Sequence, residues 1–289
     1  MRAPGTPNQL KELLASRRAA TLPGTPNALF ARVIAAHGFE ALYVTGAGIA
    51  NMSLGVPDVG LVDLTELAEH VAAISDAVTI PVLADADTGF GNALNVGRTV
   101  RLLERAGAAG IQIEDQVFPK KCGHFSGKQV IAAAEMMQKI KAAVDARIDQ
   151  GVQIVARTDA RAIEGIDAAI ARAQAYAEAG ADVTFVEAPR DAGEMRRIAT
   201  EIRVPQIANM VFGGLTPQVA QSELATLGFG GVLYANAALQ AALKSVNDVM
   251  AALKRDGSLA QVADRLAGFE ERQRSVDKPR FDALEQRYR

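Results

Sequence analysis

The segment from Val117 to Val130, VFPKKCGHFSGKQV, holds the residues with the clearest capacity for chemistry. It contains the only cysteine of the chain, Cys122, which two lysines precede and Gly123 and His124 follow. The proline, glycine and serine residues around them predict a loop rather than a strand. Nearby positive charge favours a thiolate, so Cys122 is expected to gain or lose a proton near neutral pH. A buried, inert cysteine is the alternative, but the charged and glycine-rich surroundings favour a functional loop.

Short apolar runs alternate with longer amphipathic runs along most of the chain. The apolar runs, which we interpret as strands, are Ala20–Leu22, Ala41–Val44, Pro81–Ala84, Gly110–Ile113, Val152–Ala156, Val183–Val186, Gln206–Ala208 and Gly231–Leu233. Continuous apolar strands separated by helices predict a parallel sheet covered by helices. Eight such units predict an α/β protein with a (β/α)8 TIM barrel, and an open doubly wound sheet is the alternative.

The chain has 289 residues without an internal linker rich in proline, glycine or serine. We therefore interpret residues 1–289 as one barrel domain with a C-terminal helical extension, in which 237–255 and 259–274 have helical patterns. The chain has no run of about 18 consecutive apolar residues, so no membrane span is predicted. The net charge of -2 and the low aromatic content of 5% argue against nucleic-acid binding. A single cysteine fits a reducing, cytoplasmic location.

Acidic residues follow two neighbouring predicted strands. Asp85 and Asp87 come at the end of the third apolar run, and Glu114 follows the fourth. The active sites of barrels lie at the carboxyl ends of their strands, so these three carboxylates are expected to meet. Oxygen ligands without His or Cys favour Mg²⁺, with Mn²⁺ possible. Alternatively, these acids could be a helix N-cap residue and a solvent-exposed surface residue.

Polar residues also follow the fifth, sixth and seventh runs. Arg157 has a planar fork that suits a carboxylate ligand, although it could pair only with Glu187 for structural reasons. Asn209 is either a ligand contact or a loop residue. Tyr43 lies inside the second predicted strand and is equally compatible with the core and with the site.

Four motifs in this order, DADTGFGN, GAAGIQIEDQ, KKCGH and ARTDA, resemble the isocitrate lyase/phosphoenolpyruvate mutase superfamily. The likeness extends from about Leu22 to Tyr234, and KKCGH is typical of the carbon–carbon lyase branch. The resemblance implies a (β/α)8 barrel whose last helix is swapped between subunits, usually in a homotetramer. It also implies a Mg²⁺ site at Asp85, Asp87 and Glu114, in part through water, and a loop that closes over the substrate.

The resemblance further implies roles for individual residues. Cys122 corresponds to the acid that protonates the departing carbanion. The remaining catalytic or substrate-binding positions are Tyr43, Thr45, Gly46, Ala47, Asp58, Lys120, Gly123, His124, Arg157, Glu187 and Asn209.

The segment ANMVFGGLTP after the seventh run favours one substrate type over others. Phe212 adds apolar bulk there, so we expect a small 2-hydroxy dicarboxylic acid, cleaved to pyruvate and a second acid as by 2,3-dimethylmalate lyase. The alternatives are methylisocitrate lyase, an oxaloacetate hydrolase or decarboxylase, and a phosphonopyruvate or carboxyphosphonoenolpyruvate mutase. Phosphoryl transfer needs no thiol acid, which argues against the mutase. A binding protein without catalysis is disfavoured because all the acids of the expected metal site are present.

Overall fold

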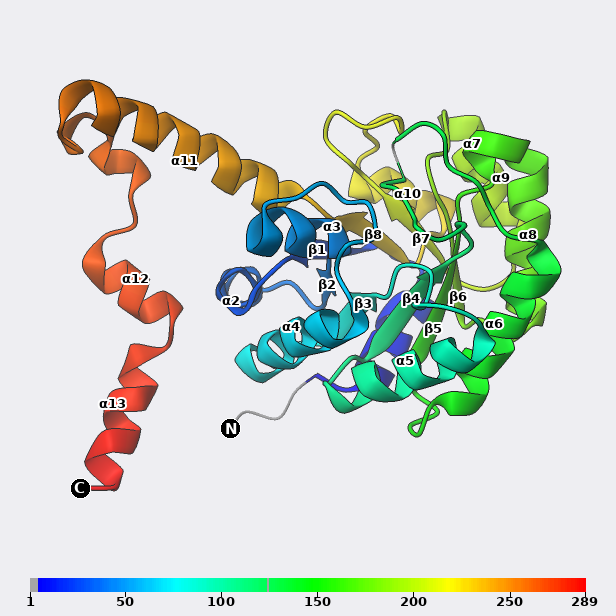
Figure 1. Cartoon of the computed structure of the whole chain (residues 1–289), viewed down its shortest axis with the longest axis horizontal. Helices are drawn as coiled ribbons and strands as arrows, with labels where there is room; N and C mark the ends of the chain where they lie inside the picture. Colours follow the sequence, from blue (N-terminus) through cyan, green and yellow to red (C-terminus); the bar gives the residue numbers. More distant parts are fainter. Residues whose placement is uncertain (1–4, 124) are drawn as a thin grey trace. The chain divides into compact units, whose positions relative to one another are not determined.

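The computed structural model describes residues 5–123 and 125–289. Eight parallel strands pair in sequence order, and the last pairs with the first, so they form a closed barrel (Figure 1). They are β1 (Ala20–Thr25), β2 (Leu42–Val44), β3 (Val82–Asp85), β4 (Gly110–Glu114), β5 (Gln153–Thr158), β6 (Val183–Val186), β7 (Gln206–Asn209) and β8 (Gly231–Tyr234). The predicted (β/α)8 fold is confirmed, and the open-sheet alternative is wrong.

One helix precedes β1, and the others connect successive strands around the outside of the barrel (Figure 1). They are α1 (Pro7–Ala15), α2 (Ala28–Ala36), α3 (Gly46–Ile49), the π-helical turn η1 (Ala50–Leu54), α4 (Leu64–Ala77), α5 (Ala93–Arg105), α6 (Ala133–Ala146), α7 (Arg161–Glu164), α8 (Ile166–Glu178), α9 (Ala192–Glu201) and α10 (Gln221–Leu227). Asn92 begins α5 with a capping box, in which its side chain accepts hydrogen bonds from the backbone of Leu94 and Asn95.

Helix α1 packs against the amino ends of the strands. Its residues Leu10 and Leu14 belong to the same buried cluster as the barrel-interior side chains of Tyr43 and Phe185. A β-carbon placed on Gly110, at the start of β4, would lie 2.7 Å from Leu10. Because this end of the barrel is filled with apolar side chains, polar chemistry is left to the carboxyl ends of the strands.

A network around Asp115 joins the carboxyl ends of β4 and β5. This fully buried carboxylate accepts hydrogen bonds from Thr158 Oγ1 at 2.7 Å, the backbone NH of Asp159 at 2.9 Å and Tyr176 Oη at 2.8 Å. Arg172 of α8 reaches the same carboxylate at 3.4 Å and also donates to the Ile131 carbonyl at 2.9 Å. The network therefore fixes the strand ends and the point where the β4–α6 loop enters its helix.

The chain folds into two compact units, residues 1–237 and 238–289. The second contains most of α11 (Ala237–Asp256), the 3-10 turn η2 (Ala260–Arg265), α12 (Phe269–Ser275) and α13 (Lys278–Arg287). A small cluster of Val249, Ala252 and Val262 forms its core. The single-domain interpretation of residues 1–289 stays a prediction. No helix of residues 5–123 and 125–289 has the length and apolarity needed to cross a membrane.

Removing the hydroxyl of Tyr176 tests the importance of the Asp115 network. Tyr176→Phe leaves a buried carboxylate with one donor fewer, so we expect the free energy of unfolding in urea to fall by about 1–2 kcal/mol. Tyr288→Phe is the matched control, because the side chain of Tyr288 is exposed. Equal stability changes in the two variants would contradict the role of the network.

Candidate active site

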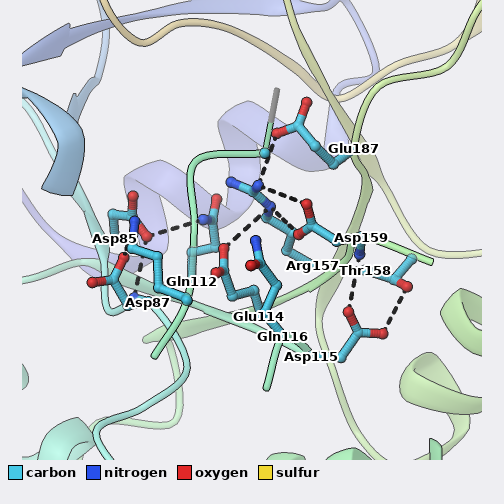
Figure 2. Close-up of polar contacts among 12 residues, drawn as sticks. Asp85, Asp87, Gln112, Glu114, Asp115, Gln116, Arg157, Thr158, Asp159 and Glu187 are labelled. Carbon is cyan, nitrogen blue, oxygen red and sulfur yellow. Dashed lines mark hydrogen bonds and ion pairs between the residues drawn. The ribbon is translucent and has the colours of Figure 1, made fainter. Parts of the chain in front are cut away.

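The three predicted acids meet at the carboxyl ends of β3 and β4 (Figure 2). Asp85 ends β3, and its Oδ1 accepts hydrogen bonds from Gln112 Nε2 and from the Asp87 backbone, both at 3.2 Å. The Asp87 carbonyl accepts a bond of 2.8 Å from the backbone NH of Glu114. The backbone pairing of the two strands thus continues past β3 and places Asp87 beside Glu114.

Asp87 reaches this position through a left-handed backbone. Its φ is 47°, a conformation that aspartate tolerates better than most residues. A β-carbon on Gly46 would lie 3.4 Å from both Asp85 Oδ2 and Asp87 Oδ1, so the two carboxylates face the same point next to this glycine. The structure thus brings the two carboxylates together through a left-handed turn rather than through an extended strand.

The acid cluster has an excess of buried negative charge. Burial raises the pKa of Asp87 to about 7, and its neighbours Asp85 and Asp58 add to the increase although Lys120 opposes it. Burial also raises the pKa of Glu114 well above its usual value, while Arg157 opposes the increase. Lys120 Nζ lies 2.8 Å from Asp87 Oδ1 and also pairs with Asp58. Such a cluster attracts cations.

The donor set fits a hydrated Mg²⁺ better than a fully protein-bound metal. Among the described residues, no three His, Cys, Asp or Glu side chains converge closely enough to hold an ion alone. Glu114 Oε1 is nonetheless buried, and it has no hydrogen-bond partner among the residues that the structure describes. Mg²⁺ keeps several waters and takes one or two carboxylates directly, so this set of oxygens suits it.

Arg157 lies at the centre of a group of carboxylates (Figure 2). Its Nε is 2.9 Å from Asp159 Oδ2 and 3.3 Å from Glu114 Oε2, and its Nη2 is 3.2 Å from Glu187 Oε2. Asn209 Nδ2 donates to the same oxygen of Glu187 at 3.2 Å. Arg157 therefore does pair with Glu187, as the structural alternative required, but it also links β4, β5 and β6 at the site.

The loop that carries Cys122 is held over the strand ends. The Gln116 side chain binds the backbone of Lys121 twice, accepting from its NH at 3.0 Å and donating to its carbonyl at 2.9 Å. The backbone NH of Cys122 donates to the Asp58 carbonyl at 3.1 Å. The Cys122 side chain is half-buried. The thiol thus lies in a fixed segment beside the acid cluster.

Gly123 approaches the site more closely than any other residue type would allow. A β-carbon at this position would lie 2.3 Å from Arg157 Nη2 and 2.8 Å from Glu187 Cγ. Contacts below 3.0 Å hardly occur for real β-carbons, so any larger residue here would have to displace the side chains of Arg157 and Glu187. His124, the next predicted residue, lies outside the described residues.

These elements enclose a pocket with about 40 Å³ of free space. Most of the predicted site residues line it, namely Tyr43, Thr45, Ala47, Asp58, Asp85, Lys120, Cys122, Gly123, Arg157, Glu187 and Asn209. Gly46, Asp87 and Glu114 contact these residues from behind. Apolar side chains of Phe185, Val211, Leu233 and Ala235 complete the wall with Asn236. This space holds only a few waters.

The expectation for Phe212 is wrong. Its side chain is 79% exposed, and Val211 lines the pocket in its place. Met210 is buried and 211–212 begin a turn after β7, so the chain direction changes just before Phe212.

Sequence reasoning also missed residues that support the site from behind. Gln116 holds the loop backbone, and Asp159 and Lys128 form a buried ion pair of 2.8 Å next to Arg157. The position of Asp159 two residues after Arg157 was the only signal for its role, since alternate residues share a face of a strand.

Comparisons with known proteins agree with this geometry. The sequence pattern of the family described as phosphoenolpyruvate phosphomutase matches residues 10–254. The chain is 48% identical over 266 residues to 2,3-dimethylmalate lyase of Eubacterium barkeri, covering 92% of each chain. It is 46% identical over 257 residues to 2-methylisocitrate lyase of Aeropyrum pernix, covering 89% of this chain and 82% of that one.

Solved structures show the same relationship. A crystal structure of 2,3-dimethylmalate lyase matches with a TM-score of 0.92 and 33% identity, covering 98% of this chain and 95% of the other. A phosphonopyruvate hydrolase in complex with oxalate and Mg²⁺ matches with a TM-score of 0.88 and 32% identity, covering 98% and 99%. With its closed barrel and its acids, arginine and cysteine around one pocket, the chain belongs to the phosphoenolpyruvate mutase/isocitrate lyase superfamily and is an enzyme of the lyase type.

Proposed function

We propose that this protein is a Mg²⁺-dependent lyase that cleaves a 2-hydroxy dicarboxylic acid between C2 and C3, as 2,3-dimethylmalate lyase does. The products are pyruvate and a second carboxylic acid. The observation that carries the proposal is that Cys122, Arg157 and Asp85 line one small pocket. An acid for a carbanion, a cation for developing charge and a ligand for a metal thus face the same space.

The metal would be held by Asp85, Asp87 and Glu114, in part through water. Bound there, Mg²⁺ supplies a Lewis acid for the oxygens of the 2-hydroxy acid end of the substrate. The solved phosphonopyruvate hydrolase that resembles this chain holds Mg²⁺ with oxalate, a small dicarboxylate. The raised pKa values of Asp87 and Glu114 support the proposal, because burial, with a smaller contribution from neighbouring carboxylates, disfavours their charged forms and a bound cation would offset this cost.

The residues of the chain account for the other steps. The 2-hydroxyl must give its proton to a base in the pocket, such as the Glu187 carboxylate, as the C2–C3 bond breaks, and the electron pair of that bond passes to C3. Arg157 and Lys120 provide positive charge beside the carboxylate that then carries the enediolate. The Cys122 thiol gives its proton to C3 as a general acid, which completes the second product. Glu187, held by Arg157 and Asn209, lies at the same wall of the pocket.

The apolar wall favours a small substrate over a tricarboxylate. Phe185, Val211, Leu233 and Ala235 provide contacts for methyl groups. None of these four can pair with an additional carboxylate, and burying an unpaired carboxylate is costly. Methylisocitrate lyase remains the second candidate because a relative of that name is 46% identical.

We also propose that the protein forms a homotetramer in the cytoplasm. On α11, the side chains of Leu243, Val246 and Met250 are exposed at spacings of three and four residues, so they share one apolar face. Burial of that face against another subunit, as the superfamily resemblance implies, would remove it from water. Light scattering at micromolar concentration tests the assembly, and a monomer would contradict it.

Changing one acid tests the metal site without relying on activity. Glu114→Gln removes a charge from the cluster, so we expect Mn²⁺ binding, measured by titration calorimetry, to weaken at least tenfold, or about 1.4 kcal/mol. Glu178→Gln is the control, since Glu178 is an exposed residue at the end of α8. Excess chelator should abolish turnover. Unchanged Mn²⁺ affinity in Glu114→Gln together with full activity in chelator contradicts the metal proposal.

Changing the thiol tests the assigned acid. Cys122→Ser keeps nearly the same size but provides a much weaker acid, so kcat for pyruvate release should fall by about 10²–10⁴-fold with little change in melting temperature. Alkylation by iodoacetamide should inactivate the enzyme, and oxalate with Mg²⁺ should protect it. Turnover by the Ser variant at close to the parent rate would leave Cys122 without this role and favour the decarboxylase or mutase alternatives.

A panel of 2-hydroxy diacids tests the substrate, with pyruvate release as the readout. We expect a higher kcat/KM for 2,3-dimethylmalate than for methylisocitrate, because each methyl against the apolar wall contributes about 1 kcal/mol. Val211→Thr should reduce this preference, whereas Phe212→Ser, which changes an exposed side chain, should not. A higher kcat/KM on methylisocitrate would reverse the ranking of the two candidates.

A further inference from the structure

Lys128, near the end of the cysteine loop, is a buried lysine to which no step above assigns a role. Its side chain is only 3% exposed, and burial of an ammonium group is costly unless the group is paired. Two partners satisfy it, the Gly123 carbonyl in the same loop and Asp159 Oδ1, at 2.8 Å, beyond the end of β5. One ammonium group therefore bridges the loop and the barrel.

Both partners are directly connected to the reacting groups. The first, Gly123, follows Cys122 and packs against Arg157 and Glu187. The second, Asp159, receives two hydrogen bonds from Arg157, from Nε at 2.9 Å and from Nη2 at 3.2 Å. Burial alone would raise the pKa of Asp159, but Arg157 and then Lys128 lower it to about 2. Asp159 is thus a permanent anion between two cations.

We propose that Lys128 is a positioning residue that fastens the cysteine loop to the Asp159–Arg157 pair, so that the thiol and the guanidinium are placed by a single connection. The loop stem is already held by backbone bonds between 116–117 and 129–130 and by Gln116. Lys128 adds the attachment at the tip, where Cys122 and Gly123 meet the site. This inference rests on the proposed lyase function for its kinetic consequence but not for its structural one.

Replacing Lys128 separates these consequences. In Lys128→Met the Gly123 carbonyl and Asp159 lose their shared donor, so the loop tip should open more often. We expect iodoacetamide to alkylate Cys122 at least about tenfold faster than in the parent, both without ligand and with Mg²⁺ and oxalate. We expect kcat for the diacid substrate to fall by about 10²-fold, the loss typical of misplaced groups, while KM changes less than kcat.

Four further variants make the result specific. Lys141→Met changes an exposed lysine on α6 and should match the parent in both readouts. Lys128→Arg keeps the charge and should restore part of the protection of Cys122. Asp159→Asn should speed alkylation as well, and the double variant Lys128→Met/Asp159→Asn should be little worse than either single variant, because both remove the same connection.

The outcomes are distinct. Parent-like alkylation and kcat in a folded Lys128→Met variant overturn the proposal. If that variant does not fold, Lys128→Arg decides, since its forked head cannot occupy the same place and should still raise the alkylation rate about threefold. An unchanged rate in Lys128→Arg would then overturn the proposal. Absence of pyruvate release by the parent would contradict the proposed function, and the alkylation rates would still test Lys128.

Discussion

Compensation of buried negative charge is the constraint on which the site depends. Carboxylates at the strand ends outnumber the cations that contact them, which include Lys120, Lys128 and Arg157. Each of these cations pairs with more than one acceptor, and each connects segments that are distant in the sequence. Two of them belong to the cysteine loop, so the loop itself supplies much of the positive charge that offsets the carboxylates beneath it. The position of the loop and the charge balance of the acids therefore depend on each other.

The barrel provides the rigidity that this arrangement needs. The acids project from strand ends whose backbone is fully paired around a closed sheet. Asp115 and its donors connect two adjacent strand ends to α8. Helix α1 fills the opposite end with leucines. The closed barrel therefore holds the acids close together in spite of their mutual repulsion, because its strands have little freedom to move apart.

The fold could be predicted from the sequence because it depends on local pattern. Apolar runs and helical periodicity placed all eight strands. Polar residues at the run ends identified part of the pocket, and the cysteine loop and the family resemblance supplied most of the other predicted pocket residues. Side-chain direction after a strand was harder to predict. Asp87 reaches the acid cluster through a left-handed backbone, and Phe212 points outward because the chain turns at Val211. Neither detail follows from alternation, which holds only while the chain is extended.

The supporting residues could not be predicted for a different reason. Lys128 and Asp159 are 31 residues apart, and only the folded barrel makes them neighbours. A lysine after a glycine in a loop is typically a solvated charge, so its sequence context predicts the opposite of what the structure shows. Gln116 was overlooked in the same way, because its partner is the backbone of Lys121, which has no side-chain signature.

The position of the thiol in the pocket has a stereochemical consequence. In the proposed reaction Cys122, which lines the pocket, gives the new hydrogen to C3, so this hydrogen comes from the enzyme wall rather than from solvent at random. That wall presents its acid from one side only. A reaction run in heavy water would then place deuterium on one face of the second product, giving a single chiral isotopomer where C3 becomes a methylene.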